Sequence, residues 1–399
     1  MNINPFRPGA GHIPPYLAGR TAEQETFRKL LQQKTILENL ILTGLRGVGK
    51  TVLLETLKPI AREHKWLWTG TDLSESVSVS EEQLAIRILS DMALIVSSII
   101  VSEKSHLGMG FETEEVVTKE PLSYDQLINI YQKTPGLVSD KLKRTLEFVW
   151  SLLNKAGIAG VVFAYDEAQT LSDHKERGEY PLSLLLEVFQ SVQRKDIPFM
   201  LLLTGLPTLC SKLVGSRTYA ERMFHVVELH HLNEVDSRDA IVKPMKEAQC
   251  TISFTEATVR KIIELSGGYP YFIQFICKEF FDIWINKSIS GESPRVSEED
   301  IIRKLDTNFF QGRWSKATDR QQELLKVIAC LPHCDDEFTV QELVAESKNR
   351  MEKGFSPSHA NQMLSYLVES GLVYKNRHGK YSLAVPLLSR FIKRQFKES

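Results

Sequence analysis

The chain has 399 residues, of which 42% are hydrophobic and 25% are charged, with a formal net charge of −1. This length predicts two or three domains of ordinary globular composition, and the near-zero charge excludes a general attraction to nucleic acid, so any basic surface must be local. No signal pattern opens the chain and its longest apolar run, residues 92–101, is too short to cross a bilayer, so we expect a cytoplasmic protein without membrane contact.

A phosphate-binding loop is the strongest motif. Residues 44–51 fit the pattern G-x-x-x-x-G-K-S/T, after an apolar run at 40–42 and before helical spacing at 52–57. Glycines let backbone N–H groups turn toward an anion, and the helix N-terminus adds partial positive charge. We expect Lys50 to reach the β- and γ-phosphates of ATP, and Thr51 to bind Mg²⁺. The residues expected to bind the nucleotide here are Gly44, Leu45, Arg46, Gly47, Val48, Gly49, Lys50 and Thr51.

Two carboxylates follow an apolar segment about 115 residues after the loop. Residues 161–165 read as a buried strand that ends at Asp166 and Glu167. Open α/β sheets bind ligands at the carboxyl ends of their strands. We therefore expect Asp166 to hold Mg²⁺, directly or through water, and Glu167 to act as the catalytic base that activates the attacking water.

Further strands are predicted at 66–71, 199–203 and 224–229, which together with intervening helices indicate a parallel sheet flanked by helices. Thr204 follows the second of these and is a candidate catalytic contact to the γ-phosphate or the water; alternatively its hydroxyl only caps a strand end. Residues 102–125 break the periodicity with glycines, acidic residues and Pro121, and read as an insertion, more simply a disordered connector than a moving loop.

The C-terminal region has a different pattern, with apolar helical spacing at 318–331, a second helix capped by Thr339, and a third begun by Ser356-Pro357 and ended by Gly371. A β-hairpin over 372–383 follows. Three helices and a hairpin resemble a winged helix-turn-helix, which offers double-stranded DNA a polar helix face and a basic wing. The helix face comprises His359, Asn361, Gln362, Ser365 and Tyr366, and the wing residues are Lys375, Arg377 and Lys380. Residues 316–399 carry 13 Lys/Arg against 10 Asp/Glu, a mild +3, so a solvated polar face is the alternative.

With these motifs the chain resembles the AAA+ ATPases, in the bacterial and archaeal group close to the origin-recognition initiators and the signal-transduction (STAND-like) ATPases. Besides the P-loop and Asp166-Glu167, the resemblance rests on the entry segment 16–23, which reads YLAGRTAE, and on 266–271 in a helical lid, which reads SGGYPY. It covers about residues 14–310.

The resemblance implies further site residues. Leu17 and Arg20 of the entry segment are expected to border the adenine. Initiator proteins place a γ-phosphate-sensing arginine in the lid, whereas this lid offers Tyr269 and Pro270, which either shape the nucleotide pocket or begin a helix. Arg222 precedes the last strand, where relatives present an arginine finger to a neighbouring subunit, with Arg217 as second choice; an exposed arginine is the alternative.

The expected fold class is therefore α/β: a P-loop NTPase (AAA+-like) core over 1–232, an α-helical lid over 233–315, and a winged-helix domain over 316–399. We predict an ATPase that uses ATP and Mg²⁺ and couples nucleotide state to a DNA-associated activity. The alternative is a nucleotide-dependent regulatory switch whose winged helix binds protein. A homo-oligomer or a protein partner fits either prediction.

Overall fold

The computed structural model describes residues 3–9, 11–97, 100–107, 114–250, 252–291, 296–377 and 379–395, and for 100–107, 114–121 and 377 it describes the backbone alone. The chain divides into two compact units. The sheet unit comprises residues 21–43 and 53–228, and the lid unit comprises residues 1–20, 44–52 and 229–399.

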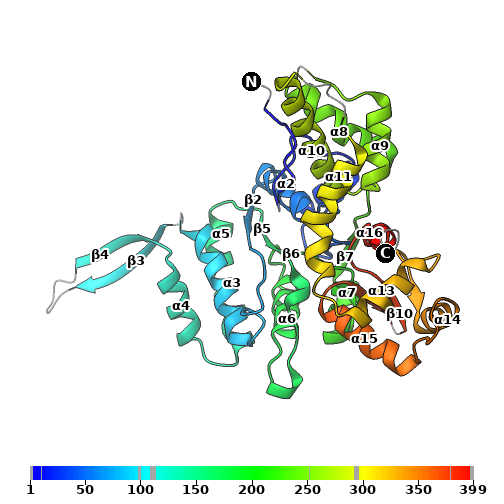
Figure 1. The fold of residues 1–399 in the computed structure, drawn as a ribbon. Helices are drawn as coiled ribbons and strands as arrows, with labels where there is room; N and C mark the ends of the chain where they lie inside the picture. The colour runs from blue at the N-terminus through cyan, green and yellow to red at the C-terminus, as the bar shows by residue number, and fades with distance from the viewer. Residues whose placement is uncertain are drawn as a thin grey trace. The chain divides into compact units, whose positions relative to one another are not determined.

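A five-stranded parallel sheet forms the centre of the sheet unit (Figure 1). Its strands are β1 Asn39–Thr43, β2 Trp66–Thr69, β5 Gly160–Tyr165, β6 Phe199–Gly205 and β7 Phe224–Glu228. They lie in the order β2-β5-β6-β1-β7, so β6 separates the strand that leads into the P-loop from the strand that precedes Asp166. Every strand of this sheet agrees with one predicted from the sequence.

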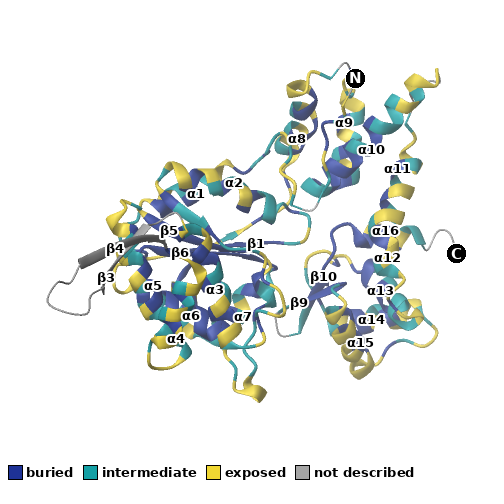
Figure 2. Cartoon of the chain, turned by 90° about the vertical axis from the view of Figure 1, so that its left-hand side faces the viewer, coloured by how far each residue is buried: buried dark blue, intermediate teal, exposed yellow. Residues whose placement is uncertain are grey.

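The central strands β1, β5 and β6 are buried along their whole length, because helices cover the sheet. The helices are α1 Thr21–Leu31, α2 Lys50–Glu63, α3 Glu81–Val96, α4 Tyr124–Lys133, α5 Val138–Lys155, α6 Pro181–Gln193 and α7 Thr208–Ser216. One hydrophobic core joins α3, α5 and α6 to β5 and β6, with Phe163 packed edge-on against both Phe189 and Phe199. Figure 2 shows buried positions, coloured dark blue, along the strands and on parts of the helices beside them. This core holds β5 and β6 in place, and the predicted site residues Asp166 and Thr204 lie at the ends of these strands.

The segment expected to be a disordered connector contains paired strands instead. β3 (Ile100–Leu107) and β4 (Glu114–Pro121) pair antiparallel, from Ile100 opposite Pro121 to Leu107 opposite Glu114. Residues 108–113 of the predicted insertion lie outside the described residues. The prediction was wrong because backbone pairing between strands, and not a repeating apolar face, defines these elements.

The lid helices of the other unit are α8 Glu234–Glu247, α9 Glu256–Ser266, α10 Pro270–Ile289, α11 Glu298–Leu305 and α12 Gln311–Trp314, with a π-helical turn at Asp306–Phe310. Pro270 occupies the first turn of α10, where a missing N–H costs nothing. The expectation that Pro270 begins a helix is therefore confirmed. Across the described ranges, no helix has the length and apolar character needed to span a membrane.

The C-terminal module of the lid unit has the predicted pattern of helices and hairpin. Its elements are α13 Asp319–Cys330, β8 Phe338–Thr339, α14 Val340–Arg350, α15 Pro357–Glu369, β9 Val373–Arg377, β10 Lys380–Leu383 and α16 Leu388–Gln395. Thr339 and Ser356 cap α14 and α15 as predicted, and the three strands lie in the order β8-β10-β9. The Arg377 side chain of the predicted basic wing lies outside the described residues.

Module and lid share one hydrophobic core. Phe310 of the π-helical turn stacks on Phe391 of α16, with ring centroids 5.2 Å apart. Arg394 of α16 forms a two-pronged ion pair with Asp306, its Nε donating to Oδ2 at 2.9 Å, and Arg390 Nη1 donates to the Glu264 carbonyl at 2.6 Å. The module is therefore fixed to the lid by both apolar and polar contacts.

Candidate nucleotide site

The P-loop has a backbone that only glycine adopts readily. Gly44, Gly47 and Gly49 have φ values of 153°, 81° and 92°. A Cβ on Gly44 would lie 2.5 Å from the Leu229 carbonyl oxygen, whereas a Cβ on Gly49 would meet nothing within 4 Å. The loop is thus tightly packed at its start and open at Gly49, as a cradle for an anion requires.

Lys50 points back into this loop. Its side chain is buried, with 7% of the residue exposed, and Nζ donates to the Gly44 and Leu45 carbonyls at 2.9 and 3.0 Å. The ammonium therefore lies inside the loop curve, where a phosphate would find its strongest cation.

Arg20 supports the loop from outside. Its Nη2 donates to the Val48 carbonyl at 2.9 Å and to the His230 carbonyl at 2.8 Å. The buried guanidinium thus ties the loop to the segment that follows β7. Leu17, the other entry-segment residue, is half-buried. For both, contact with the adenine stays a prediction.

The first turn of α10 touches the loop within the lid unit. The backbone N–H of Tyr271 donates to the Gly47 carbonyl at 3.2 Å, directly after Pro270. A Cβ on Gly47 would lie 3.4 Å from the Tyr271 Cβ. Pro270 therefore places the start of a lid helix against the phosphate-binding backbone, while a contact of Pro270 itself with nucleotide is untested.

The charge of an arginine in the loop acts on an arginine of the lid. Arg46 is exposed at the tip of the loop, and Arg313 of α12 stacks over the Phe309 ring at 4.4 Å. Burial, and then the positive charge of Arg46, lowers the pKa of Arg313. Arg313 was not predicted, since nothing in its local sequence connects it to residue 46.

The acidic end of β5 is organised around Asp166. The Asp166 residue is 3% exposed, and its Oδ1 accepts a hydrogen bond from the Glu167 backbone N–H at 2.8 Å and another from Thr204 Oγ1. Thr204 is fully buried. Its hydroxyl thus orients the carboxylate expected to hold Mg²⁺, which is a more specific arrangement than a capped strand end; a contact with the γ-phosphate stays a prediction.

Glu167 is exposed and has a left-handed backbone, with φ 51° and ψ 33°. A non-glycine residue with positive φ costs strain that the surrounding structure must sustain. The strained turn directs the chain away from the sheet into the short 3₁₀ helix Ala168–Thr170. The predicted base therefore lies at a sharp corner directly after the buried strand.

Two polar residues near the acids were missed by sequence reasoning. Asp72 follows β2 and forms a parallel bridge with Asp166; burial, followed by the charges of Asp166, Glu167 and Glu55, raises the pKa of Asp72. Gln169 donates from Nε2 to Glu167 Oε2. Only the D-E-A-Q spacing could have indicated Gln169, and the pairing of β2 with β5 was needed to find Asp72.

Arg222 ends the short helix Thr218–Arg222 before β7 and is exposed. Within the described part of the chain it has no ion pair. Arg217, the second choice, lies 3.5 Å from Glu187 through Nη2. The structure therefore leaves Arg222 the more available of the two, and its action on a neighbouring subunit is untested.

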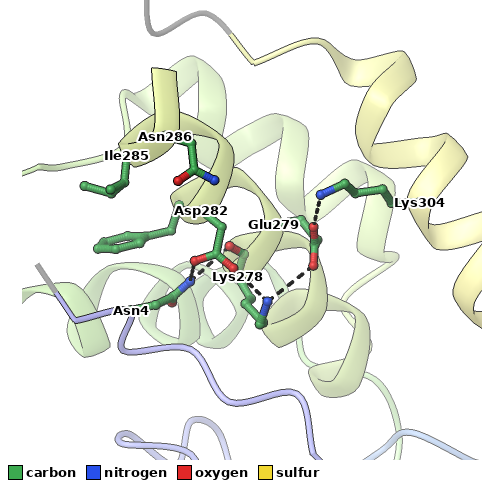
Figure 3. A pocket seen from close by; sticks show the side chains of 8 residues that line it. Asn4, Lys278, Glu279, Asp282, Ile285, Asn286 and Lys304 are labelled. Atoms are coloured by element: carbon green, nitrogen blue, oxygen red, sulfur yellow. Dashed lines mark hydrogen bonds and ion pairs between the residues drawn. The ribbon is translucent and has the colours of Figure 1, made fainter. Parts of the chain in front are cut away.

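A separate polar hollow lies on α10 (Figure 3). Asn4 donates to Asp282 Oδ1 at 2.7 Å, Lys278 contacts Asp282 at 2.7 Å, and Lys304 contacts Glu279 at 2.5 Å. These charges satisfy one another. The network therefore holds the N-terminal segment and α11 to α10. Both lysines that line this hollow, Lys278 and Lys304, are paired with carboxylates, so the hollow does not resemble a phosphate site.

The parallel sheet with its P-loop, the acidic strand end, the helical lid and the C-terminal helices and hairpin together define the fold of an AAA+-type P-loop ATPase. The predicted resemblance and fold class are confirmed at this level.

Solved structures with a similar fold align with nearly the whole chain. The Walker-type ATPase paby2304 of Pyrococcus abyssi superimposes with a TM-score of 0.59 and 14% identity, over 94% of this chain and 96% of that one. The ORC2 protein of Aeropyrum pernix, solved as ADPNP-ADP complexes, gives a TM-score of 0.53 and 13% identity, over 98% of both chains. At such low identity the likeness concerns the fold alone.

Comparisons of sequence match a smaller part of the chain than comparisons of structure do. A family model described as a domain of unknown function (DUF8462) matches residues 307–392, which begin within the π-helical turn and end within α16. No protein of curated function matches the sequence.

Proposed function

We propose that this protein binds and hydrolyses ATP. The observation that carries the proposal is the P-loop itself: three glycines at positive φ, an open position at Gly49, and Lys50 turned into the loop. This arrangement fits a polyphosphate, because such a loop offers an anion its backbone N–H groups together with one buried ammonium. The AAA+-type fold supports the same conclusion.

Each site residue has a distinct task in this proposal. Lys50 binds the β- and γ-phosphates, and Thr51 and Asp166 are the hard oxygen ligands that Mg²⁺ prefers. Thr204 orients Asp166, and Glu167 accepts a proton from the attacking water. Mg²⁺, when bound, neutralises charge on the phosphates.

Glu167→Gln tests the hydrolytic part. The amide preserves the shape of the side chain but cannot take a proton, so turnover should fall by roughly 100-fold or more while ATP affinity stays within about twofold. Steady-state phosphate release and binding of a fluorescent ATP analogue would measure the two quantities. Glu176→Gln, at an exposed residue in the same region, is the matched control. Wild-type turnover in a folded Glu167→Gln protein would remove Glu167 from the base role.

We further propose that the C-terminal module binds double-stranded DNA. His359, Asn361, Gln362, Ser365 and Tyr366 of α15 are all exposed, and Ala360, Met363, Leu364 and Leu367 are buried. Lys375 of the hairpin is exposed as well. Amide side chains on an exposed helix suit the edges of adenine, and a lysine suits the phosphates.

The alternative function is a regulatory switch whose module binds protein. The observation in its favour is the shared core of module and lid, in which much of the module's apolar surface packs against the lid helices. Affinity for a DNA duplex, measured between about 50 and 200 mM salt, separates the two. DNA binding requires a steep fall in affinity with salt, and the switch requires none.

A further inference from the structure

Gln169 lies between the predicted base and the end of the neighbouring strand. Its Nε2 donates to Glu167 Oε2, and its Oε1 accepts from the Leu206 backbone N–H at 3.0 Å. A backbone N–H can only donate, so the amide oxygen must face Leu206 and the NH₂ group must face the carboxylate. The orientation of the amide is thereby determined by its two partners together.

Gly205 leaves the room that this amide occupies. A Cβ on Gly205 would lie 2.7 Å from Gln169 Oε1 and 3.0 Å from a Leu209 methyl carbon. The first of these atoms is the end of a flexible side chain, which can move away. An alanine at 205 would therefore displace the Gln169 amide without requiring the strand to unfold.

The turn around Gln169 is held by contacts that do not involve its amide. Thr170 Oγ1 donates to the Leu73 carbonyl at 3.0 Å, and Lys212 Nζ donates to the Gln169 carbonyl and to Ser172 Oγ, the latter at 3.0 Å. Removal of the side-chain amide leaves all of these in place. The loss of the amide should therefore affect Glu167 more than the fold.

We propose that Gln169 is a positioning residue for the general base, holding one carboxylate oxygen of Glu167 to the end of β6. Asp166 and Glu167 are thus each tied to β6, Asp166 by Thr204 and Glu167 by Gln169. The clamp offsets the mobility expected of an exposed carboxylate at a strained corner. This inference rests on the proposed ATPase function, because it assigns Gln169 a task in that reaction.

Gln169→Met tests the clamp, since methionine has similar length and no hydrogen-bonding amide. We expect kcat to fall by roughly 10- to 100-fold, because small misplacements of a catalytic group are costly. The KM for ATP should stay within about twofold, since Gln169 lies outside the P-loop. Gln83→Met, at an exposed position of α3, is the matched control and should leave both constants unchanged.

Two double-mutant cycles show whether Gln169 positions Glu167 or only stabilises the fold. Gly205→Ala should reproduce much of the kcat loss in the wild type and add little in Gln169→Met, whereas Gly215→Ala, where a Cβ meets nothing, should do neither. In Glu167→Gln, measured by single turnover, Gln169→Met should cause no further loss. Additive losses in that background would show that Gln169 does not act through Glu167.

The outcomes separate this inference from the ATPase proposal. An unchanged kcat in Gln169→Met, with Glu167→Gln inactive, would overturn the clamp and leave the ATPase proposal standing. Full turnover in Glu167→Gln would overturn the role of the base and the clamp with it. A kcat loss confined to Gln169→Met and Gly205→Ala, absent from both controls, supports the clamp.

Discussion

Lys50 shows how a single residue is prepared for a ligand. Its ammonium donates to two carbonyls of its own loop, so a bound phosphate must replace or share those hydrogen bonds. The exchange is favourable because a phosphate oxygen is charged, whereas a carbonyl oxygen is only a dipole.

Lys50→Ala should therefore weaken ATP binding by at least about tenfold, the lower range expected for a lost charged hydrogen bond. It also leaves the Gly44 and Leu45 carbonyls without this donor, so circular dichroism should confirm that the protein is folded. Calorimetric titration with ATP measures the effect, and Lys34→Ala, at an exposed residue, is the control. Unaltered affinity in the folded variant would contradict the P-loop assignment.

At this scale the sequence was informative where a motif is contiguous. Lys50, Asp166 and Glu167 each follow a predicted strand, so their positions could be predicted from local pattern. The task of Arg20 could not, because its guanidinium bonds to a carbonyl 210 positions away. Gln169 and Gly205 likewise depend on which strands are neighbours, which periodicity alone does not determine.

Among the elements, α15 was well predicted because several local signals agree. A capping serine, a proline in the first turn and apolar positions on one side define the helix before any tertiary contact. β3 and β4 have no such signals; their register joins residues up to 21 positions apart, as in Ile100 opposite Pro121. Local sequence therefore determines helices with caps better than strands whose partners lie further along the chain.

The β9–β10 hairpin next to α15 carries a prediction of its own. If Lys375 meets a DNA phosphate, Lys375→Ala should weaken binding to all duplex sequences alike and reduce the salt slope by about one. Fluorescence anisotropy across a salt series measures both, with Lys353→Ala, an exposed residue outside the hairpin, as control. A slope unchanged from the wild type would remove Lys375 from the interface.

At the scale of the whole molecule, the position of Arg222 predicts that activity depends on assembly. If exposed Arg222 acts on a neighbour's ATP, specific activity should rise with protein concentration, and Arg222→Ala should lower turnover by up to about 10³-fold with little change in ATP affinity.

Mixing inactive variants provides the control for this prediction. Arg222→Ala protein retains an intact P-loop, and Lys50→Ala protein retains an intact Arg222, so mixed assemblies should recover part of the turnover. Light scattering on the same samples measures assembly size. A monomer whose specific activity is independent of concentration would instead favour the regulatory switch.

The sequence could not predict that lid and module share a core, because an apolar helix face does not specify its partner. That shared core has a mechanical consequence. α10 begins at the P-loop, where Tyr271 bonds to Gly47, and its 20 residues extend over about 30 Å. With Phe310 stacked on Phe391 and Asp306 paired with Arg394, apolar and charged contacts hold the module to the lid. A small tilt of α10 at the P-loop would therefore pass through these contacts to the module, and α15 would move farther than the start of α10 does.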